Sequence, residues 1–192
     1  MKVIGGIHKG KKLLFIKEKD IRPTKDVVRE AIFDVLRGWI VGKKIIDLFA
    51  GTGALGIEAI SEGGEKVIFV ESKGKIVDIL KKNVINVGIE KQVSILKGGV
   101  EEKIKEMRNF KYDLVIADPP YDFPVNKLKE ILETIISSEV INENGIIIVE
   151  HRTKYSIPES AKFIVYKNKK YGKTSVSYLK RKENEEYSSL SG

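Results

Sequence analysis

The sequence contains no cysteine, and it has only two histidines in 192 residues. Disulfides, thiolate nucleophiles and thiolate metal ligands are therefore excluded. His8 and His151 lie far apart without other metal ligands beside them, so we predict no metal site. No apolar stretch approaches the roughly 20 residues of a membrane span, and the first residues lack the apolar core of a signal peptide. We expect a soluble, cytoplasmic protein that does not bind a membrane.

Positive charge is in excess. Lys and Arg number 35 against 27 Asp and Glu, which gives a formal net charge of +8 and a pI near 9.4. Such an excess suggests a polyanionic partner, with nucleic acid before acidic membrane. A Lys-rich proteome would give the same excess, so the placement of the charges has to decide between the two interpretations.

Apolar runs and helical patterns alternate along the middle of the chain. Five apolar runs lack in–out alternation, which is typical of strands buried on both faces, and four helical patterns separate them. This order predicts a doubly wound, Rossmann-like α/β sheet that is mostly parallel. The five runs are KIIDLFA, KVIFVE, QVSILKG, YDLVIADPP and GIIIVEH.

Both ends of the chain depart from this alternation. Residues 1–23 form a basic extension in which a short β-hairpin is expected around the HKGKK turn, and a helix capped by Thr24 follows. Residues 162–182 predict an antiparallel C-terminal hairpin, and residues 184–192 predict a disordered tail. We predict a single domain over residues 1–192.

The stretch DLFAGTGALG, from Asp47 to Gly56, carries glycines in the spacing G-x-G-x-x-G. Glycines let the backbone approach a ligand, and the free amides at the start of the next helix attract an anion. Glu71 ends the next strand, twenty residues after Gly51, where a carboxylate can accept hydrogen bonds from ribose hydroxyls. NAD and S-adenosylmethionine both carry a ribose, so the loop alone leaves both open beside a tight turn without ligand.

The second candidate site is ADPPY, which ends the fourth run. Two prolines cannot continue a central strand, and a rigid strand end is the plain structural interpretation. The functional interpretation starts from an exocyclic nucleobase amine, whose lone pair is drawn into the ring. The Asp118 carboxylate and the Pro119 carbonyl can accept its N–H groups and turn that lone pair out of the plane. Tyr121 can stack on the base, and Asp118 can take the proton.

Basic residues gather near both ends. Nine Lys or Arg and three acids occur up to Arg29, and eight basic residues without an acid occur from Lys162 to Lys182. Basic strands with interleaved aromatic side chains suit phosphate contact and base stacking, whereas hairpin edges protected by Lys are the alternative. The interleaved aromatic residues are Phe163, Tyr166, Tyr171 and Tyr178.

Three segments together resemble a known family. DLFAGTG resembles the first signature motif of class I S-adenosylmethionine-dependent methyltransferases, and DPPY resembles the motif of those that act on planar exocyclic nitrogens. With RPTKDVVREAIFDVL, residues 22–36, the chain resembles the bacterial RsmD family over essentially its whole length. The resemblance implies S-adenosylmethionine as the cofactor and one guanine N2 of 16S ribosomal RNA as the target, within a 30S subunit or an assembly intermediate.

The resemblance and the motifs together assign candidate site residues, although helix capping and surface salt bridges are the alternative for Arg22, Thr24 and Arg29. The expected catalytic residues are Asp118, Pro119 and Tyr121. The expected cofactor-binding residues are Asp47, Phe49, Gly51, Thr52, Gly53, Glu71 and Ser72. The expected substrate-binding residues are Arg22, Thr24, Lys25, Arg29 and Pro120.

One departure from the family pattern and three rival functions stay open. Gly98 and Gly99 stand where many class I enzymes place an Asp or Asn that contacts the adenine amine, so the group that recognises adenine is not assigned. The rivals are a DNA adenine-N6 methyltransferase, a NAD-binding oxidoreductase and a non-catalytic RNA-binding protein. The RPT…RE segment and the lack of a target-recognition domain speak against the first, and the lack of room for a separate substrate domain speaks against the second.

Overall fold

A seven-stranded sheet forms the centre of the protein in the computed structural model, which describes residues 1–15, 26–108, 110–120 and 122–182. The strand order is β3-β2-β1-β4-β5-β7-β6; β1 to β5 run parallel, and β7 pairs antiparallel with β5 and β6. The predicted fold class and its C-terminal hairpin are confirmed. The strands are β1 (Lys44–Leu48), β2 (Lys66–Glu71), β3 (Val93–Lys97), β4 (Tyr112–Ala117), β5 (Ile141–Arg152), β6 (Phe163–Tyr171) and β7 (Thr174–Arg181).

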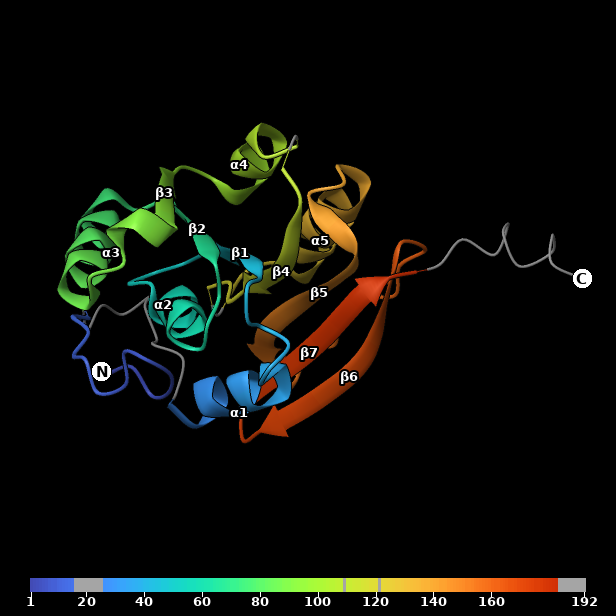
Figure 1. Ribbon diagram of the computed structural model, residues 1–192. Coiled ribbons are helices and arrows are strands. Elements are labelled where there is room, and N and C mark those ends of the chain that lie inside the picture. The colour runs from blue at the N-terminus through green and yellow to red at the C-terminus, as the bar shows by residue number, and fades with distance from the viewer. Residues whose placement is uncertain (16–25, 109, 121, 183–192) are drawn as a thin grey trace, which may run out of the picture.

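Helices cover both faces of the sheet (Figure 1). The first three pack on one face and the last two on the other, each against its own apolar core. None of the helices in the described part of the chain has the length and apolar character that crossing a membrane requires. The helices are α1 (Asp26–Leu36), α2 (Ala54–Ser61), α3 (Gly74–Val87), α4 (Val100–Glu106) and α5 (Val125–Ser137), and the short 3-10 helix η1 (Glu90–Gln92) precedes β3.

The central strands are apolar throughout because both of their faces are covered. In β4, Leu114 and Ile116 belong to the core beneath α1, α2 and α3, whereas Val115 and Ala117 belong to the core beneath α4 and α5. Successive side chains of a strand point to opposite faces, so neither face can carry polar residues. Polar side chains are left for the strand ends, where the parallel strands meet at one edge.

Strand β5 begins before the GIIIVEH run that predicted it. Tyr112 already pairs with Ile141, and the register shifts before Leu114 pairs with Ile146. The intervening polar residues, 142–144, show no strand pattern of their own. They form an irregularity within the strand, whose pairing with β4 is made by the residues on either side of them, a context that periodicity cannot report.

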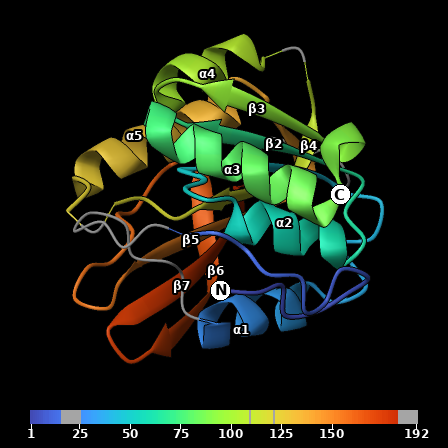
Figure 2. The ribbon, with the colours of Figure 1, turned by 90° about the vertical axis from the view of Figure 1, so that its left-hand side faces the viewer.

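The N-terminal extension forms a smaller hairpin than we predicted. Its described part has one antiparallel bridge, between Lys2 and Lys12, in place of two strands. The segment lies against α2 and α3 (Figure 2), whose side chains bind its backbone. Glu58 of α2 accepts two of its amides, and Asn83 of α3 both accepts from and donates to the backbone of Leu14. Helix side chains therefore satisfy backbone groups that a second strand would otherwise pair.

Two predictions about the chain ends are not tested here. The tail expected at residues 184–192 lies outside the described residues, and the single domain over residues 1–192 stays a prediction.

Candidate active site

A cavity of about 1120 Å³ opens at the C-terminal ends of the parallel strands. Open α/β sheets bind ligands at this edge, beside the point where the strand order reverses, here between β1 and β4. The loops that follow β1, β2, β3 and β4 line the cavity together with the end of β5. The glycine loop after β1 and the proline corner after β4 thus face one space.

The glycine loop turns sharply between β1 and α2. Phe49, Gly51 and Gly53 take positive φ angles of 58°, 55° and 86°. The two glycines reach this region without a steric cost, whereas Phe49 holds a conformation that residues with a Cβ rarely adopt. At Gly56 a Cβ would lie 2.3 Å from Cε1 of Phe69, so the absent side chain lets α2 pack directly on β2.

Asp47 is buried beneath the loop and only 1% exposed. Its Oδ2 accepts the amide of Gly56 at 2.9 Å, which fixes the start of α2. Burial is the main cause that raises the pKa of Asp47 to about 8; the Gly56 amide opposes the shift, and the charges of Asp118 and Glu71 add to it. A cation bound in the cavity would favour the ionised form of this carboxyl group.

Glu71 is held by backbone amides on both of its oxygens. Oε2 accepts from the amide of Gly51 at 2.9 Å, and Oε1 accepts from the amide of Lys73 at 2.9 Å. Each carboxylate oxygen can accept more than one hydrogen bond. The side chain is therefore fixed at the cavity wall with acceptor capacity left on both oxygens, and its contact with ribose hydroxyls stays a prediction.

The proline corner joins the glycine loop through an aromatic contact. Asp118, Pro119 and Pro120 line the same cavity as the loop. Phe49 of the loop meets Phe123, just beyond the corner, edge to face with ring centroids 5.0 Å apart. Aromatic pairs of this geometry are stabilising, so the two loops support each other's position.

Comparison with known proteins identifies the family. Residues 1–180 match the family described as conserved hypothetical protein 95. YlbH of Bacillus subtilis (strain 168), predicted to be an rRNA methyltransferase, is 34% identical over 185 residues, which are 95% of this chain and 100% of that protein. The ribosomal RNA small subunit methyltransferase D of Buchnera aphidicola subsp. Acyrthosiphon pisum is 33% identical over 167 residues, 87% of this chain and 86% of its own. The chain belongs to the RsmD family.

Solved structures agree with this assignment. The Thermus thermophilus protein TTHA0928 has a TM-score of 0.80 at 25% identity and covers 93% of this chain and 98% of its own. Escherichia coli yhhF, predicted to be a methyltransferase, has a TM-score of 0.79 at 25% identity and covers 96% of this chain and 99% of its own. This RsmD-family chain is a methyltransferase, and its cofactor is S-adenosylmethionine, as the sequence predicted.

The charge of the cavity fits that cofactor. Among the described lining residues seven are acidic and two are basic. S-adenosylmethionine carries a sulfonium, an ammonium and a carboxylate group and is a net cation, whereas the pyrophosphate of NAD outweighs its cationic nicotinamide ring and makes it a net anion. Carboxylates attract the former and repel the latter. The acidic residues are Asp47, Glu71, Glu101, Glu102, Asp118, Asp122 and Glu150, and the basic ones are Lys73 and Arg152.

Most of the expected site residues line this cavity. Gly53 does not line the cavity. A Cβ at Gly53 would point towards Leu80 and lie 2.3 Å from its Cδ1, so the glycine serves the packing of the loop on α3. Gly98 and Gly99 do line it, so main-chain recognition of adenine stays open. Those on the cavity are Asp47, Phe49, Gly51, Thr52, Glu71, Ser72, Asp118, Pro119 and Pro120. Arg22, Thr24, Lys25 and Tyr121 lie outside the described residues.

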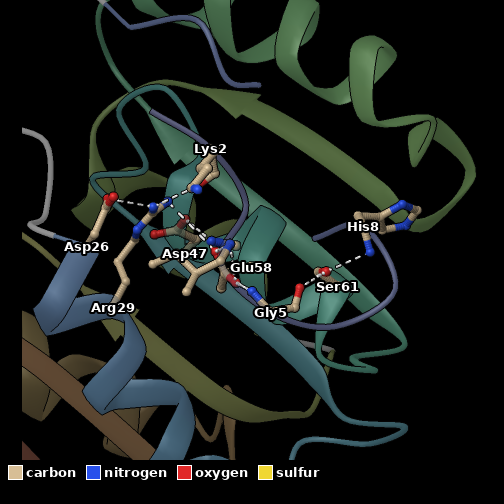
Figure 3. Close-up of polar contacts among 10 residues, drawn as sticks. Lys2, Gly5, His8, Asp26, Arg29, Asp47, Glu58 and Ser61 are labelled. Carbon is tan, nitrogen blue, oxygen red and sulfur yellow. Dashed lines mark hydrogen bonds and ion pairs between the residues drawn. The ribbon is translucent and has the colours of Figure 1, made fainter. Parts of the chain in front are cut away.

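The prediction that Arg29 contacts RNA is wrong, because its side chain is fully buried. Its Nη2 donates to the carbonyl of Lys2 at 2.8 Å and to Oδ1 of Asp26 at 2.9 Å (Figure 3). Its Nη1 lies 3.8 Å from Oε2 of Glu58. Glu58 in turn accepts the amide of Gly5 at 2.6 Å. Arg29 therefore ties α1 to α2 and to the N-terminal segment.

Two of the four aromatic residues proposed for base stacking are core residues. Phe163 and Tyr178 are buried, with 3% and 0% exposed. Tyr166 is exposed on β6 and Tyr171 is half-buried, so a stacking surface on this hairpin is limited to these two. The place of each strand in the sheet decides this: β7 lies between β5 and β6 and is buried at positions 174–179, whereas most positions of the edge strand β6 are exposed. The composition of the segment could not show it.

Sequence reasoning missed the end of β5. Glu150 and Arg152 line the cavity. Glu150 ends an apolar run just as Glu71 does, and that position was a usable signal. Met1 and Phe15 also line the cavity, and no pattern indicated them, because the N-terminal segment reaches the site only through tertiary packing.

The described residues contain no group of three or more His, Cys, Asp or Glu side chains that could hold a metal ion. The absence of a metal from the reaction stays a prediction.

Proposed function

We propose that the protein transfers a methyl group from S-adenosylmethionine to the exocyclic N2 of one guanine in 16S ribosomal RNA. The observation that carries the proposal is the single cavity shared by the glycine loop and the Asp118–Pro120 corner. A donor held by the loop and an amine held by the corner would then meet in one space. Proximity and orientation of this kind supply a large part of a bimolecular rate acceleration.

The cofactor would be held mainly by residues at the ends of β1, β2 and β3. Glu71 would accept the ribose hydroxyls, Phe49 and Ser72 line the same wall, and Gly98–Gly99 offer main-chain groups for the adenine. When bound, S-adenosylmethionine supplies a methyl group on a sulfonium centre, with a neutral thioether as the leaving group. The protein's task is therefore positioning rather than activation of the donor.

Asp118 and Pro119 would prepare the amine. The exocyclic nitrogen of guanine is a weak nucleophile, because its lone pair is conjugated with the ring. The Asp118 carboxylate and the Pro119 carbonyl would accept the two N–H groups and hold the lone pair out of the ring plane. The nitrogen must lose one proton on methylation, and an Asp118 oxygen would accept it.

Residues outside the described part belong to the same proposal. Tyr121 would stack on the base beside Pro120. Arg22, Thr24 and Lys25 would contact the base or phosphates at the mouth of the site.

An RNA substrate is supported by the relatives and by the placement of charge. Two of the named relatives are described as rRNA methyltransferases, one of them of the small subunit. Exposed lysines of the β6–β7 hairpin lie next to Thr174, which lines the cavity. RNA that enters the cavity from this side would meet a basic surface. We propose a cytoplasmic 30S subunit or an assembly intermediate as the partner.

The test of the function is tritiated methyl transfer to 30S particles, naked 16S RNA and duplex DNA, followed by identification of the labelled nucleoside. We expect label in RNA, as N2-methylguanosine. Label in DNA, or in another nucleoside, would overturn the proposed substrate.

The role of Asp118 is tested by Asp118→Ala. Loss of the acceptor should lower kcat by about 100- to 10,000-fold, while the Kd values for S-adenosylmethionine and RNA change little. The control is Asp78→Ala, which removes an exposed carboxylate of α3 away from the cavity and should leave kcat unchanged. Unchanged turnover in Asp118→Ala would refute the assigned role.

A further inference from the structure

The end of β5 places a second carboxylate beside Asp118. Ala117 of β4 pairs with Val149 of β5, so Asp118 and Glu150 occupy the next positions along the two neighbouring strands. Both residues line the main cavity. Both also line a smaller hollow of about 40 Å³, which Pro119 and Pro120 line as well.

Alternation along the strands puts these side chains on one face. Ile116 and Ile148 belong to the core beneath α1, α2 and α3, while their neighbours Ala117 and Val149 belong to the opposite core. Positions 118 and 150 continue the first series, since every second residue of a strand shares a face. Arg152, two positions after Glu150, lies on the same face, and it also lines both the main cavity and the smaller hollow.

The atom next to the methylated amine distinguishes guanine from the other amino bases. Beside N2 guanine carries N1–H, which is a hydrogen-bond donor, and O6 follows as an acceptor. Beside N6 adenine carries the N1 lone pair, and beside N4 cytosine carries the N3 lone pair, which are both acceptors. A carboxylate next to the amine-binding group therefore accepts from guanine and repels adenine and cytosine.

We propose that Glu150 selects guanine by accepting its N1–H while Asp118 accepts from N2. This inference rests on the proposed function and names the residue that gives the site its base specificity. Arg152 lies two positions further on the same face, where the guanine edge presents O6. Its Nη2 lies 3.3 Å from Oδ1 of Asp122, an ion pair that anchors the guanidinium at the mouth of the cavity. Asp118 and Glu150 thus offer two acceptors and Arg152 offers a donor, in the order that complements the N2 and N1–H donors and the O6 acceptor of guanine.

The experiment compares guanine with 2-aminopurine at the methylated position. 2-Aminopurine keeps the 2-amino group, but its N1 is an acceptor and it has no O6. The substrates are 30S particles reconstituted with 16S RNA in which ligation of a synthetic segment introduces either base. The native protein should prefer guanine in kcat/KM by about 100-fold, because 2-aminopurine turns a lone pair towards Glu150.

Glu150→Gln keeps the shape of the side chain and adds an N–H donor. Its amide can accept from N1–H of guanine or donate to N1 of 2-aminopurine. The ratio of kcat/KM for guanine to kcat/KM for 2-aminopurine should therefore fall from about 100 to below about 10. The matched control is Glu143→Gln on an exposed position of the same strand, which should keep the native preference.

Each outcome has one meaning. A partial folding defect scales kcat/KM for both bases equally, so it can neither produce nor hide a narrowed ratio in the molecules that fold. An unchanged ratio in the folded, active Glu150→Gln variant would overturn the assignment of Glu150. Failure of the native protein to methylate N2 of guanine would overturn the proposed function, and the inference would fall with it. Methylation of N2 together with a narrowed ratio in Glu150→Gln supports both.

Discussion

The carboxylates of the cavity have different properties because their surroundings differ. Asp47 is buried and binds the start of α2, whereas Glu71 sits at the wall with both oxygens oriented by amides. Asp118 follows a strand and precedes Pro119, whose carbonyl is the second acceptor that we propose, whereas the carbonyl of Pro120 accepts the amide of Phe123 at 2.8 Å. One side-chain chemistry thus provides a structural group at Asp47 and the ribose and amine acceptors that we propose at Glu71 and Asp118, set apart by burial and hydrogen bonding.

The pH dependence of stability reports the state of Asp47. Its folded-state pKa of about 8 is far above the usual range of an aspartate carboxyl group, so the folded protein keeps a proton that the unfolded chain releases. The contribution of Asp47 to the free energy of unfolding therefore falls as pH rises from about 4 to about 8, because this group binds more protons in the folded state.

We expect Asp47→Asn to remove this fall, because the amide does not titrate. The variant should match the native protein near pH 4 and be more stable by a few kcal/mol (roughly 2–4) near pH 8.5 in urea unfolding. The control Asp78→Asn, at an exposed site, should show no such growth with pH. A stability difference for Asp47→Asn that stays constant across this range would contradict the raised pKa.

At the scale of elements, a buried ion cluster fixes the N-terminal segment. Arg29 of α1 and Glu58 of α2 are both buried, and between them they bind the backbone of Lys2, Ile4 and Gly5 (Figure 3). Burial raises the pKa of Glu58, while the two amides and Arg29 oppose the shift. Because Met1 lines the cavity, this cluster holds one wall of the site in place.

Arg29→Met should destabilise the fold by about 3–5 kcal/mol, since it leaves Glu58 buried without its cation. Amide hydrogen exchange at Ile4 and Gly5 should accelerate, because their acceptor is no longer held. Urea unfolding and exchange mass spectrometry measure the two effects.

Arg37→Met provides a matched comparison at the residue that directly follows α1. Arg37 also pairs with an aspartate three residues earlier, Asp34, but both side chains are exposed. Its loss should cost less than about 0.5 kcal/mol. Equal losses in the two variants would show that the Arg29 cluster does not clamp the segment.

At the scale of the whole molecule, the charges are separated. The cavity is acidic although the chain has a net charge of +8, and exposed lysines lie on the β6–β7 hairpin at one edge of the sheet. Such a separation allows one protein to bind a cationic cofactor inside and a polyanion outside.

Replacing Lys169, Lys170 and Lys173 by Gln should weaken RNA binding about 10-fold or more at low salt and reduce the slope of log K against log salt by roughly two. S-adenosylmethionine binding should not change. The control replaces Lys81, Lys82 and Lys91 by Gln. These residues are exposed near the opposite edge of the sheet, and the change removes the same number of charges. Equal weakening by both triple variants would indicate net charge rather than a surface.

The sequence by itself determined the layered sheet, the glycine loop and the proline corner. Each of these is encoded locally: buried parallel strands need uninterrupted apolar runs, a tight strand–helix turn needs glycine, and a double proline ends a strand. The acids that follow those strands were visible for the same reason, since the position of Glu71 or Asp118 depends only on where its own strand ends.

Tertiary structure decided the rest, because it depends on contacts between distant segments. Whether Arg29 faces RNA or Glu58, whether Tyr178 stacks on a base or fills the core, and whether residues 142–144 form a strand are set by partners that local periodicity does not reveal. The neighbouring placement of Asp118 and Glu150 is of the same kind: a register between β4 and β5 brings together two residues that are 32 positions apart in the sequence.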